Sequence, residues 1–269
     1  MKIRQMFEKG TVFSFEIFPP KKTSSIDTIY NTLEQLRDLK PDFISVTFGA
    51  GGSSNNNTTC EIAQTIKEEI VKILGEFKKH GISNILALRG DINPDIPPKS
   101  DFKYASDLIS FIKRHGDFDI AGACYPEGHM ETENLVTDVL NLKKKIEAGA
   151  EHLISQLFFD NSYFYSFLER TQIAGIDVPI EAGIMPVTNK GQIERMVSMC
   201  GASLPPKFAK MIQKYEHSPE ALRDAGIAYA IDQIVDLVSN GVDGIHLYTM
   251  NNPYVAKRIS EAVESIIRS

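Results

Sequence analysis

The chain has 269 residues, of which 42% are hydrophobic and 24% charged, and its net charge is −6. This composition excludes a disordered chain, a collagen and a coiled-coil rod. The acidic excess argues against nucleic acid as a partner. No stretch approaches the ~18 uncharged apolar residues of a membrane span, and the N-terminus lacks the pattern of a secretory signal. We therefore expect a cytoplasmic protein that binds neither membrane nor nucleic acid.

Seven short β-rich runs alternate with amphipathic segments along the chain. Such repetition indicates parallel strands joined by right-handed helical crossovers. The runs predicted to be strands are 12–18, 43–48, 84–88, 120–125, 152–159, 180–186 and 244–249. Apolar periodicity predicts helices over 26–39, 133–148 and 225–239.

The choice between an open sheet and a closed barrel rests on length and on the glycine pattern. Neither a G-x-G-x-x-G loop nor a Walker A loop follows an early strand, which argues against a nucleotide-binding open sheet. A (β/α)8 TIM barrel has ~250 residues. We therefore predict a single barrel domain over residues 1–269, with its functional side chains just past the C-terminal ends of the strands.

Glu16 is the most informative residue at these strand ends. Alternation along the first strand places Ser14 and Glu16 on the face opposite Phe13 and Phe15. If the apolar face meets the helices, Glu16 points into the barrel, where burial raises a carboxyl pKa and suits it to general acid catalysis. The alternative is a structural glutamate paired with an arginine or lysine.

Each of the other polar residues near the strand ends could either bind a ligand or serve only as a turn or surface residue. Asp91 can accept hydrogen bonds from a ligand, or it can simply form a turn. Asp138, Asn141 and Lys145 share one helix face, which fits either a phosphate site or a solvated surface. The side-chain amides of Gln156 and Gln192 could form hydrogen bonds with the donors and acceptors of a heterocyclic ligand, although glutamines on an ordinary surface are commoner. The three cysteines, Cys60, Cys124 and Cys200, lack zinc spacing, so we expect reduced thiols and no metal.

Seven motifs in one order resemble those of the methylenetetrahydrofolate reductase family, in its short bacterial type. The resemblance extends over nearly the whole chain. The motifs are FEIFPPK at 15–21, SVTFGAGG at 45–52, ALRGD at 87–91, YPEGH at 125–129, QLFFD at 156–160, GIMP at 183–186 and HLYTMN at 246–251.

This resemblance implies an FAD-dependent oxidoreductase that reduces 5,10-methylenetetrahydrofolate to 5-methyltetrahydrofolate in one-carbon metabolism and methionine biosynthesis. Glu16 matches the general acid, and Asp91 matches a carboxylate between flavin and folate. The positions that match folate contacts are Glu16, Asp91, Gln156, Gln192 and Tyr248. Those that match flavin contacts are Thr47, Ala50, Arg89, Gly90, Asp91, Tyr104, Ala105, Tyr125, His129, Asp138, Asn141, Lys144 and Lys145.

The chain departs from the family where a third strand belongs. Residues 58–80 are predicted to form one amphipathic helix more than 30 Å long at ~1.5 Å per residue, where the family has helix, strand and helix. The chain is thus roughly 20 residues short of a complete barrel. Either the strand is deleted, or residues are missing from the written sequence near Lys67–Ile70. We expect the second, because an unclosed barrel exposes two strand edges; an unbroken chain there would exclude it.

Two further departures concern the partners. Met196 stands where the family often stacks an aromatic ring on nicotinamide, so the electron donor is expected to be NAD(P)H or a reduced protein partner. Asn252 stands where a folate-binding arginine often occurs. We also expect a homo-oligomer or a subunit of a complex. The alternatives to the reductase are a flavin-free, phosphate-binding barrel lyase or isomerase, and a non-catalytic barrel subunit of a larger redox complex.

Overall fold

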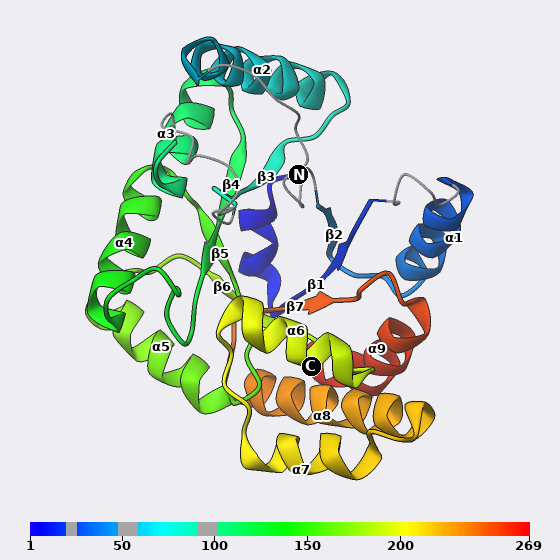
Figure 1. Cartoon of the computed structure of the whole chain (residues 1–269). Helices are drawn as coiled ribbons and strands as arrows, with labels where there is room; N and C mark the ends of the chain where they lie inside the picture. The colour runs from blue at the N-terminus through cyan, green and yellow to red at the C-terminus, as the bar shows by residue number, and fades with distance from the viewer. Residues whose placement is uncertain (20–25, 48–58, 91–101) are drawn as a thin grey trace.

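The computed structural model describes residues 1–19, 26–47, 59–90 and 102–269. Within them, seven parallel strands form one curled sheet with helices on its outer face (Figure 1). The order across the sheet is β2-β1-β7-β6-β5-β4-β3. The strands are β1 (Val12–Ile17), β2 (Phe43–Val46), β3 (Asn84–Ala87), β4 (Asp119–Cys124), β5 (His152–Ser155), β6 (Ile180–Ile184) and β7 (Gly244–Tyr248). All seven predicted strands are confirmed.

The helices follow the strands as the alternation predicts. They are α1 (Ile26–Arg37), α2 (Thr59–Lys79), α3 (Ala105–His115), α4 (Leu135–Glu147), α5 (Asn161–Ile173), α6 (Lys190–Cys200), α7 (Pro206–Tyr215), α8 (Pro219–Ser239) and α9 (Pro253–Ile267), with a short 3₁₀ helix η1 (Ile3–Lys9) before β1. The three helices predicted from periodicity are α1, α4 and α8. Helix α8 begins earlier than predicted, since a proline is well suited to the first helical position. In the described ranges, no helix has the length and apolar character needed to span a membrane.

Strand β1 shows how alternation builds the two faces of the sheet. Phe13 and Phe15 are buried in the main apolar cluster, together with Leu36 of α1 and Val263 of α9. Ser14 and Glu16 therefore lie on the inner face, as predicted. Burying one apolar face of each strand under the helices supplies the main stabilisation of the fold.

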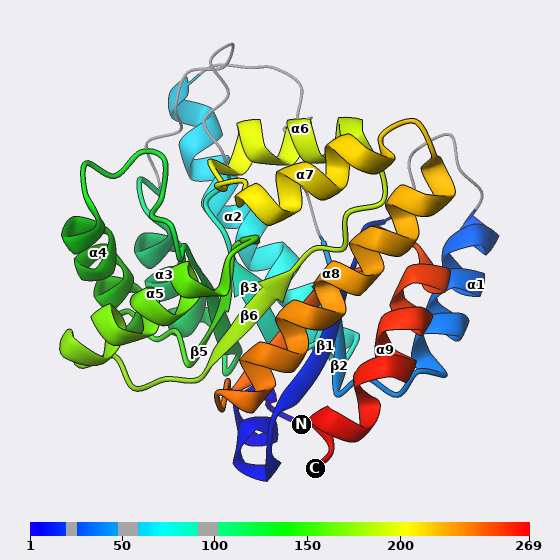
Figure 2. The same ribbon diagram turned by 90° about the horizontal axis from the view of Figure 1, so that it is seen from below.

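The two ends of the curled sheet differ. Helix η1 closes the end at which the strands begin: the Arg4 amide donates to Asp119 Oδ2 (2.9 Å), and the Phe7 ring lies 5.7 Å from the His152 ring. Figure 2 shows η1 at the opposite end of the molecule from α6. The strands therefore point their C-terminal ends, with the candidate functional residues, toward α6.

Among the described residues the barrel is not closed, because β2 and β3 are the two edges of the sheet that they form. Helix α2 runs unbroken through Lys67–Ile70. Because the structure follows the written sequence, its continuity there does not test whether residues are missing; that expectation stays a prediction, and the predicted single helix is confirmed. The physical reason is that Ile70, Leu74 and Phe77 keep one apolar face in phase, which packs with α3.

The open edges predict self-association. Parallel strands are normally buried on both faces, yet Val46 in β2 is 59% exposed. Unpaired edge strands recruit other strands. We expect the protein to self-associate as its concentration rises and Val46→Lys to weaken this association, measured by light scattering. Val136→Lys, at a 68% exposed position of α4, is the matched control. If both variants associate like the parent, β2 is not the interface.

Candidate functional site

The Glu16 carboxyl lies at the C-terminal end of β1 on the inner face of the sheet. Its Oε1 accepts a hydrogen bond from the Thr47 hydroxyl at 2.9 Å. Burial raises the pKa of Glu16, and the bond from Thr47 opposes that rise. Among the described residues, no arginine or lysine forms an ion pair with Glu16. The arrangement therefore favours a proton-carrying acid over a structural ion pair.

Tyr248 ends the neighbouring strand β7 and stands opposite Glu16 in the register. Its hydroxyl donates to the Ser155 carbonyl at 2.8 Å. A Cβ at Gly183 would lie 2.2 Å from that carbonyl oxygen and 2.8 Å from the Tyr248 ring. Only glycine therefore allows β6 to pass so close to Tyr248, which explains this residue of the GIMP motif.

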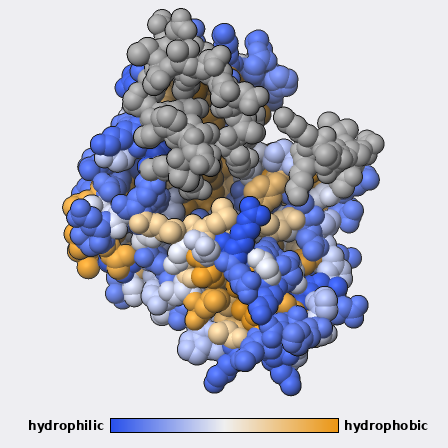
Figure 3. All heavy atoms as spheres, in the orientation of Figure 1, coloured by the Kyte–Doolittle hydropathy of each residue, from blue (hydrophilic) through white to orange (hydrophobic). Residues whose placement is uncertain are grey.

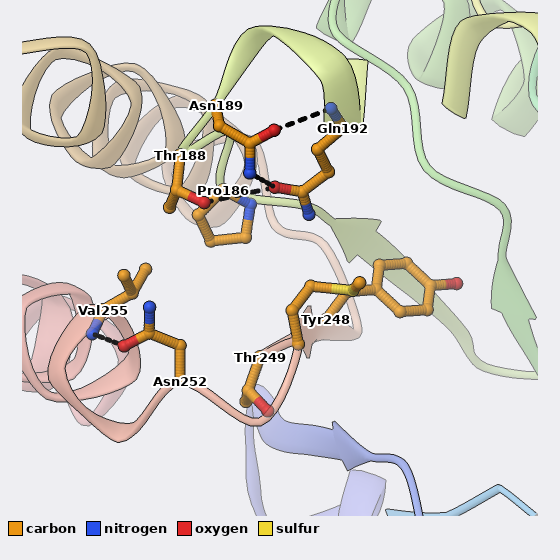
Figure 4. Close-up of a pocket in the computed structure, with 9 residues that line it drawn as sticks. Pro186, Thr188, Asn189, Gln192, Tyr248, Thr249, Asn252 and Val255 are labelled. Carbon is orange, nitrogen blue, oxygen red and sulfur yellow. Dashed lines mark hydrogen bonds between the residues drawn. The ribbon is translucent and has the colours of Figure 1, made fainter. Parts of the chain in front are cut away.

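A pocket of about 300 Å³ opens beside Tyr248. In Figure 4, Thr188, Asn189 and Gln192 lie on one side of it, and Thr249 and Asn252 lie on the other. The lining is completed by Pro186, Tyr248, Met250 and Val255. The lining thus combines polar amides and hydroxyls with the apolar Pro186, Met250 and Val255, and Figure 3 shows hydrophobic residues gathered among hydrophilic ones in the lower centre of the view. Such a mixture suits an aromatic ligand with polar edges.

The two candidate glutamines differ in their placement. Gln192 lines the pocket, where its Oε1 accepts from the Thr188 hydroxyl at 3.1 Å. Gln156 follows β5, and its Oε1 accepts the Leu157 amide at 2.9 Å. Gln156 therefore does not line the pocket. It follows Ser155, whose carbonyl accepts the hydrogen bond from the pocket residue Tyr248.

A second cluster joins the end of β4 to helix α4. The Tyr125 and His129 rings meet edge to face at 4.5 Å, and Lys145 Nζ lies 5.5 Å from the Tyr125 ring centre. Asp138 accepts the His129 amide (3.3 Å) and the Thr132 hydroxyl (3.2 Å), so it organises this loop. Lys145 Nζ donates to the Ala123 carbonyl at 2.7 Å, and burial lowers its pKa.

The remaining predicted flavin contacts surround this cluster. Arg89 follows β3 and pairs with Glu131 (2.7 Å), and Gly90 accepts from Arg89 Nε (3.1 Å). Tyr104 is exposed and caps α3, whose first residue is Ala105. On α4, Lys144 Nζ donates to Asn141 Oδ1 at 3.1 Å. Two predicted residues, Ala50 and Asp91, lie outside the described residues.

This donor set fits a dinucleotide with an aromatic ring system. Arg89, Lys144 and Lys145 supply positive charge for a pyrophosphate, and Tyr125 supplies a ring face for stacking. Among the described residues, no group of three or more His, Cys, Asp or Glu side chains could hold a metal ion. The positive charges and the ring face of Tyr125 make an anionic organic cofactor the kind of group that this cluster suits.

Reasoning from the sequence missed part of the pocket. Thr249 and Asn251 contact the end of β1 through their side chains, and Thr188 and Asn189 border Gln192. Their position just after β7 and β6 is the signal that could have identified them. Asn252 lines the pocket and caps α9 by accepting the Val255 amide at 3.2 Å. Met196, in α6, is half-buried and packs against the apolar cluster that contains Ile193 and Phe208.

Comparison with known proteins gives one consistent result. The family model for methylenetetrahydrofolate reductase matches residues 2–264. The 5,10-methylenetetrahydrofolate reductase of Pectobacterium carotovorum is 37% identical over 256 residues, covering 88% of this chain and 85% of that protein. Its counterpart in Escherichia coli is 36% identical, covering 88% and 86%.

The length of these alignments bears on the missing strand. The Pectobacterium alignment has 256 positions but contains only 88% of these 269 residues, so about 19 positions have no counterpart in this chain. That deficit is the size of the missing strand with its connections, which was predicted at roughly 20 residues from the size of a barrel unit.

Solved structures agree on the fold. An uncharacterized protein from Clostridium thermocellum, described as binding two copies of 5-methyl-5,6,7,8-tetrahydrofolic acid, superposes with a TM-score of 0.64 at 14% identity, covering 98% of this chain and 99% of that one. Tryptophan synthase from M. tuberculosis gives 0.52 at 10% identity, covering 100% of both chains. From the family model and the relatives, the chain belongs to the methylenetetrahydrofolate reductase family of oxidoreductases.

Proposed function

We propose that this chain, as a single catalytic domain, reduces 5,10-methylenetetrahydrofolate to 5-methyltetrahydrofolate with FAD as its cofactor. The observation that carries the proposal is the Glu16 carboxyl: burial raises its pKa, Thr47 orients it, and Tyr248 connects it to the adjoining pocket. Membership of the family supplies the reaction class.

The proposed chemistry needs one proton and one hydride. Glu16 donates its proton to the ring nitrogen that leaves when the five-membered ring of the folate opens, and the substrate then carries an iminium carbon. Reduced FAD, when bound, supplies the hydride that converts this carbon to a methyl group. Glu16 regains its proton from solvent. Gln192 would hold the pterin edge with its side-chain amide, which lines the pocket and whose Nε2 donates, among the described residues, only to the weak acceptor Met185 Sδ at 4.0 Å.

The residues proposed to hold FAD are those of the β3, β4 and α4 cluster. Lys145, Lys144 and Arg89 would neutralise the pyrophosphate, and Tyr125 would contact a ring. Thr47, which also matches a flavin contact, lies beside Glu16 and bonds to its carboxyl. Asp91 and Ala50 belong to the same proposed set through the family resemblance alone.

The electron donor and the assembly are also proposals. A flexible, half-buried Met196 replaces the aromatic ring that would stack on nicotinamide, so a reduced protein partner competes with NAD(P)H as the donor. The cytoplasmic location, the place in methionine biosynthesis, and the homo-oligomer or complex stay predictions.

The test is the colour and the electron transfer of the purified chain. We expect flavin absorbance, either as isolated or after addition of FAD. Anaerobic additions of NADH, NADPH and reduced ferredoxin then identify the donor by bleaching that absorbance, and methylenetetrahydrofolate restores it. Colourless protein that cannot be reconstituted would contradict the proposal and favour the flavin-free lyase or isomerase. Bleaching without restoration by the folate would favour the non-catalytic redox subunit.

A further inference from the structure

The backbone just past Glu16 is held by a side chain from the other end of the chain. The Phe18 amide donates to Asn251 Oδ1 at 2.8 Å, and Asn251 Nδ2 donates to the Phe18 carbonyl at 2.9 Å. One carboxamide thus satisfies both backbone groups of a residue 233 positions away. Asn251 acts here as a neighbouring strand would.

Thr249 adds a third bond to the same segment. Its side chain is buried, and its hydroxyl donates to the Glu16 carbonyl at 2.7 Å. The same hydroxyl accepts the Asn251 amide at 3.3 Å. The regular pairing of β1 with β7 ends at Glu16 and Tyr248, so these two side chains continue the pairing after the backbone of β7 has turned away.

The turn that makes this contact possible is strained. Met250 and Asn251 have φ values of 51° and 56°, in the left-handed region that non-glycine residues seldom occupy. The Cβ makes this backbone conformation costly, less so for asparagine than for methionine. Strain of this kind persists where the surrounding structure imposes it, commonly at functional sites. Here it aims the Asn251 side chain at β1.

We propose that Asn251 is a positioning residue for Glu16, a role that rests on the function proposed above for Glu16. On the other side of β1, the Thr47 amide donates to the Ile17 carbonyl at 3.0 Å, and the Thr47 hydroxyl holds the carboxyl itself. With Asn251 bonded to Phe18, the strand end is held from both neighbours. Proton transfer depends steeply on such placement, since a shift of 1 Å can cost about 100-fold in rate.

The test replaces Asn251 with glycine, which tolerates the left-handed backbone and removes the whole side chain with its carboxamide; the added backbone freedom is what the control variant accounts for. We expect the reoxidation of reduced flavin by methylenetetrahydrofolate to slow by about 10–100-fold in kcat with little change in KM. Flavin binding and flavin reduction should be unchanged. Lys40→Gly is the matched control, because Lys40 is another non-glycine residue with a positive φ of 52°, far from the site.

A second measurement does not depend on the reaction. Amide hydrogen exchange in the flavin-free chain should show faster exchange at Phe18 in Asn251→Gly and unchanged exchange there in Lys40→Gly. Faster exchange with an unchanged folate step would overturn the positioning role. Equal loss of both half-reactions would overturn it as well, because it would indicate a general structural role. If the parent chain itself does not react with the folate, the proposed function fails while the exchange result still decides whether Asn251 holds the strand end.

Discussion

The Glu16→Gln variant is expected to bind flavin and to accept electrons like the parent, yet to reoxidise with methylenetetrahydrofolate at least 100-fold more slowly. General acids contribute about 10²–10⁴-fold to such steps. Glutamine has the same size, and its amide oxygen can still accept from Thr47, so the fold should be retained. Stopped-flow absorbance separates the two half-reactions. Equal loss of both would refute the general acid role.

The pH dependence of the folate step gives an independent check on Glu16. Only the protonated carboxyl can donate, and burial raises its pKa above the ordinary value. The rate of the folate step should therefore fall as the pH rises through this raised pKa, and flavin reduction should not follow the same curve. Glu8→Gln, an exposed change in η1, should leave both half-reactions unaltered.

Inside the sheet, below the site, lies a buried group of titrating side chains. The Ser14 hydroxyl oxygen is 2.5 Å from Glu181 Oε2 and 2.6 Å from His246 Nδ1. All three residues are at most 1% exposed. Because serine has one hydroxyl proton, both contacts can be hydrogen bonds only if Glu181 or His246 Nδ1 carries another. Burial raises the pKa of Glu181 to about 8 and lowers that of His246 to about 3.

These shifts give stability two opposing dependences on pH. Glu181 binds its proton more tightly in the folded state, so the free energy of unfolding falls as the pH rises from about 4.3 toward 8. Burial lowers the pKa of His152 to about 4, so both histidines bind protons more tightly when unfolded. Up to about pH 6.5 the two histidines therefore oppose the effect of Glu181. Above that pH the histidines are neutral in both states, and the raised pKa of Glu181 makes stability fall toward pH 8 by about 1 kcal/mol per pH unit.

The Glu181→Gln variant tests this account. Glutamine keeps the volume and a hydrogen-bond partner for Ser14 but does not titrate. We expect the loss of stability between about pH 6.5 and 8 to disappear, which makes the variant gain about 2 kcal/mol relative to the parent across that range. Urea unfolding from pH 5 to 9 measures it. Glu261→Gln, on the exposed face of α9, is the control. Parallel curves for all three proteins would contradict a protonated Glu181.

Local patterns were sufficient for the elements and for part of the site. The seven strands were predictable because parallel strands are short, apolar and separated by amphipathic helices. The inward direction of Glu16 followed from alternation along β1, since each strand turns successive side chains to opposite faces. Gln192 was a candidate because functional residues of barrels lie near the strand ends, whereas Tyr248 was named through the family resemblance.

Contacts between distant segments could not be predicted in this way. Ser14, Glu181 and His246 belong to three strands, and only the register of β1, β6 and β7 brings them together. The two hydrogen bonds between Asn251 and Phe18 depend on the left-handed backbone of Met250 and Asn251, which the identity of these residues does not predict. The placement of Gln156 beyond the pocket lining depends on its bond to Leu157.

The sequence by itself determined the alternation of elements, the single long helix where a third strand belongs, and the acid at the end of β1, because these depend on periodicity within one segment. Only the tertiary structure decided that β2 and β3 are the edges of the described sheet, that Glu16 is held by Thr47 and Thr249, and that Ser14 joins a buried glutamate to a buried histidine. The reason is that hydrogen bonds and desolvation depend on which side chains meet in space, and these partners lie up to 233 residues apart.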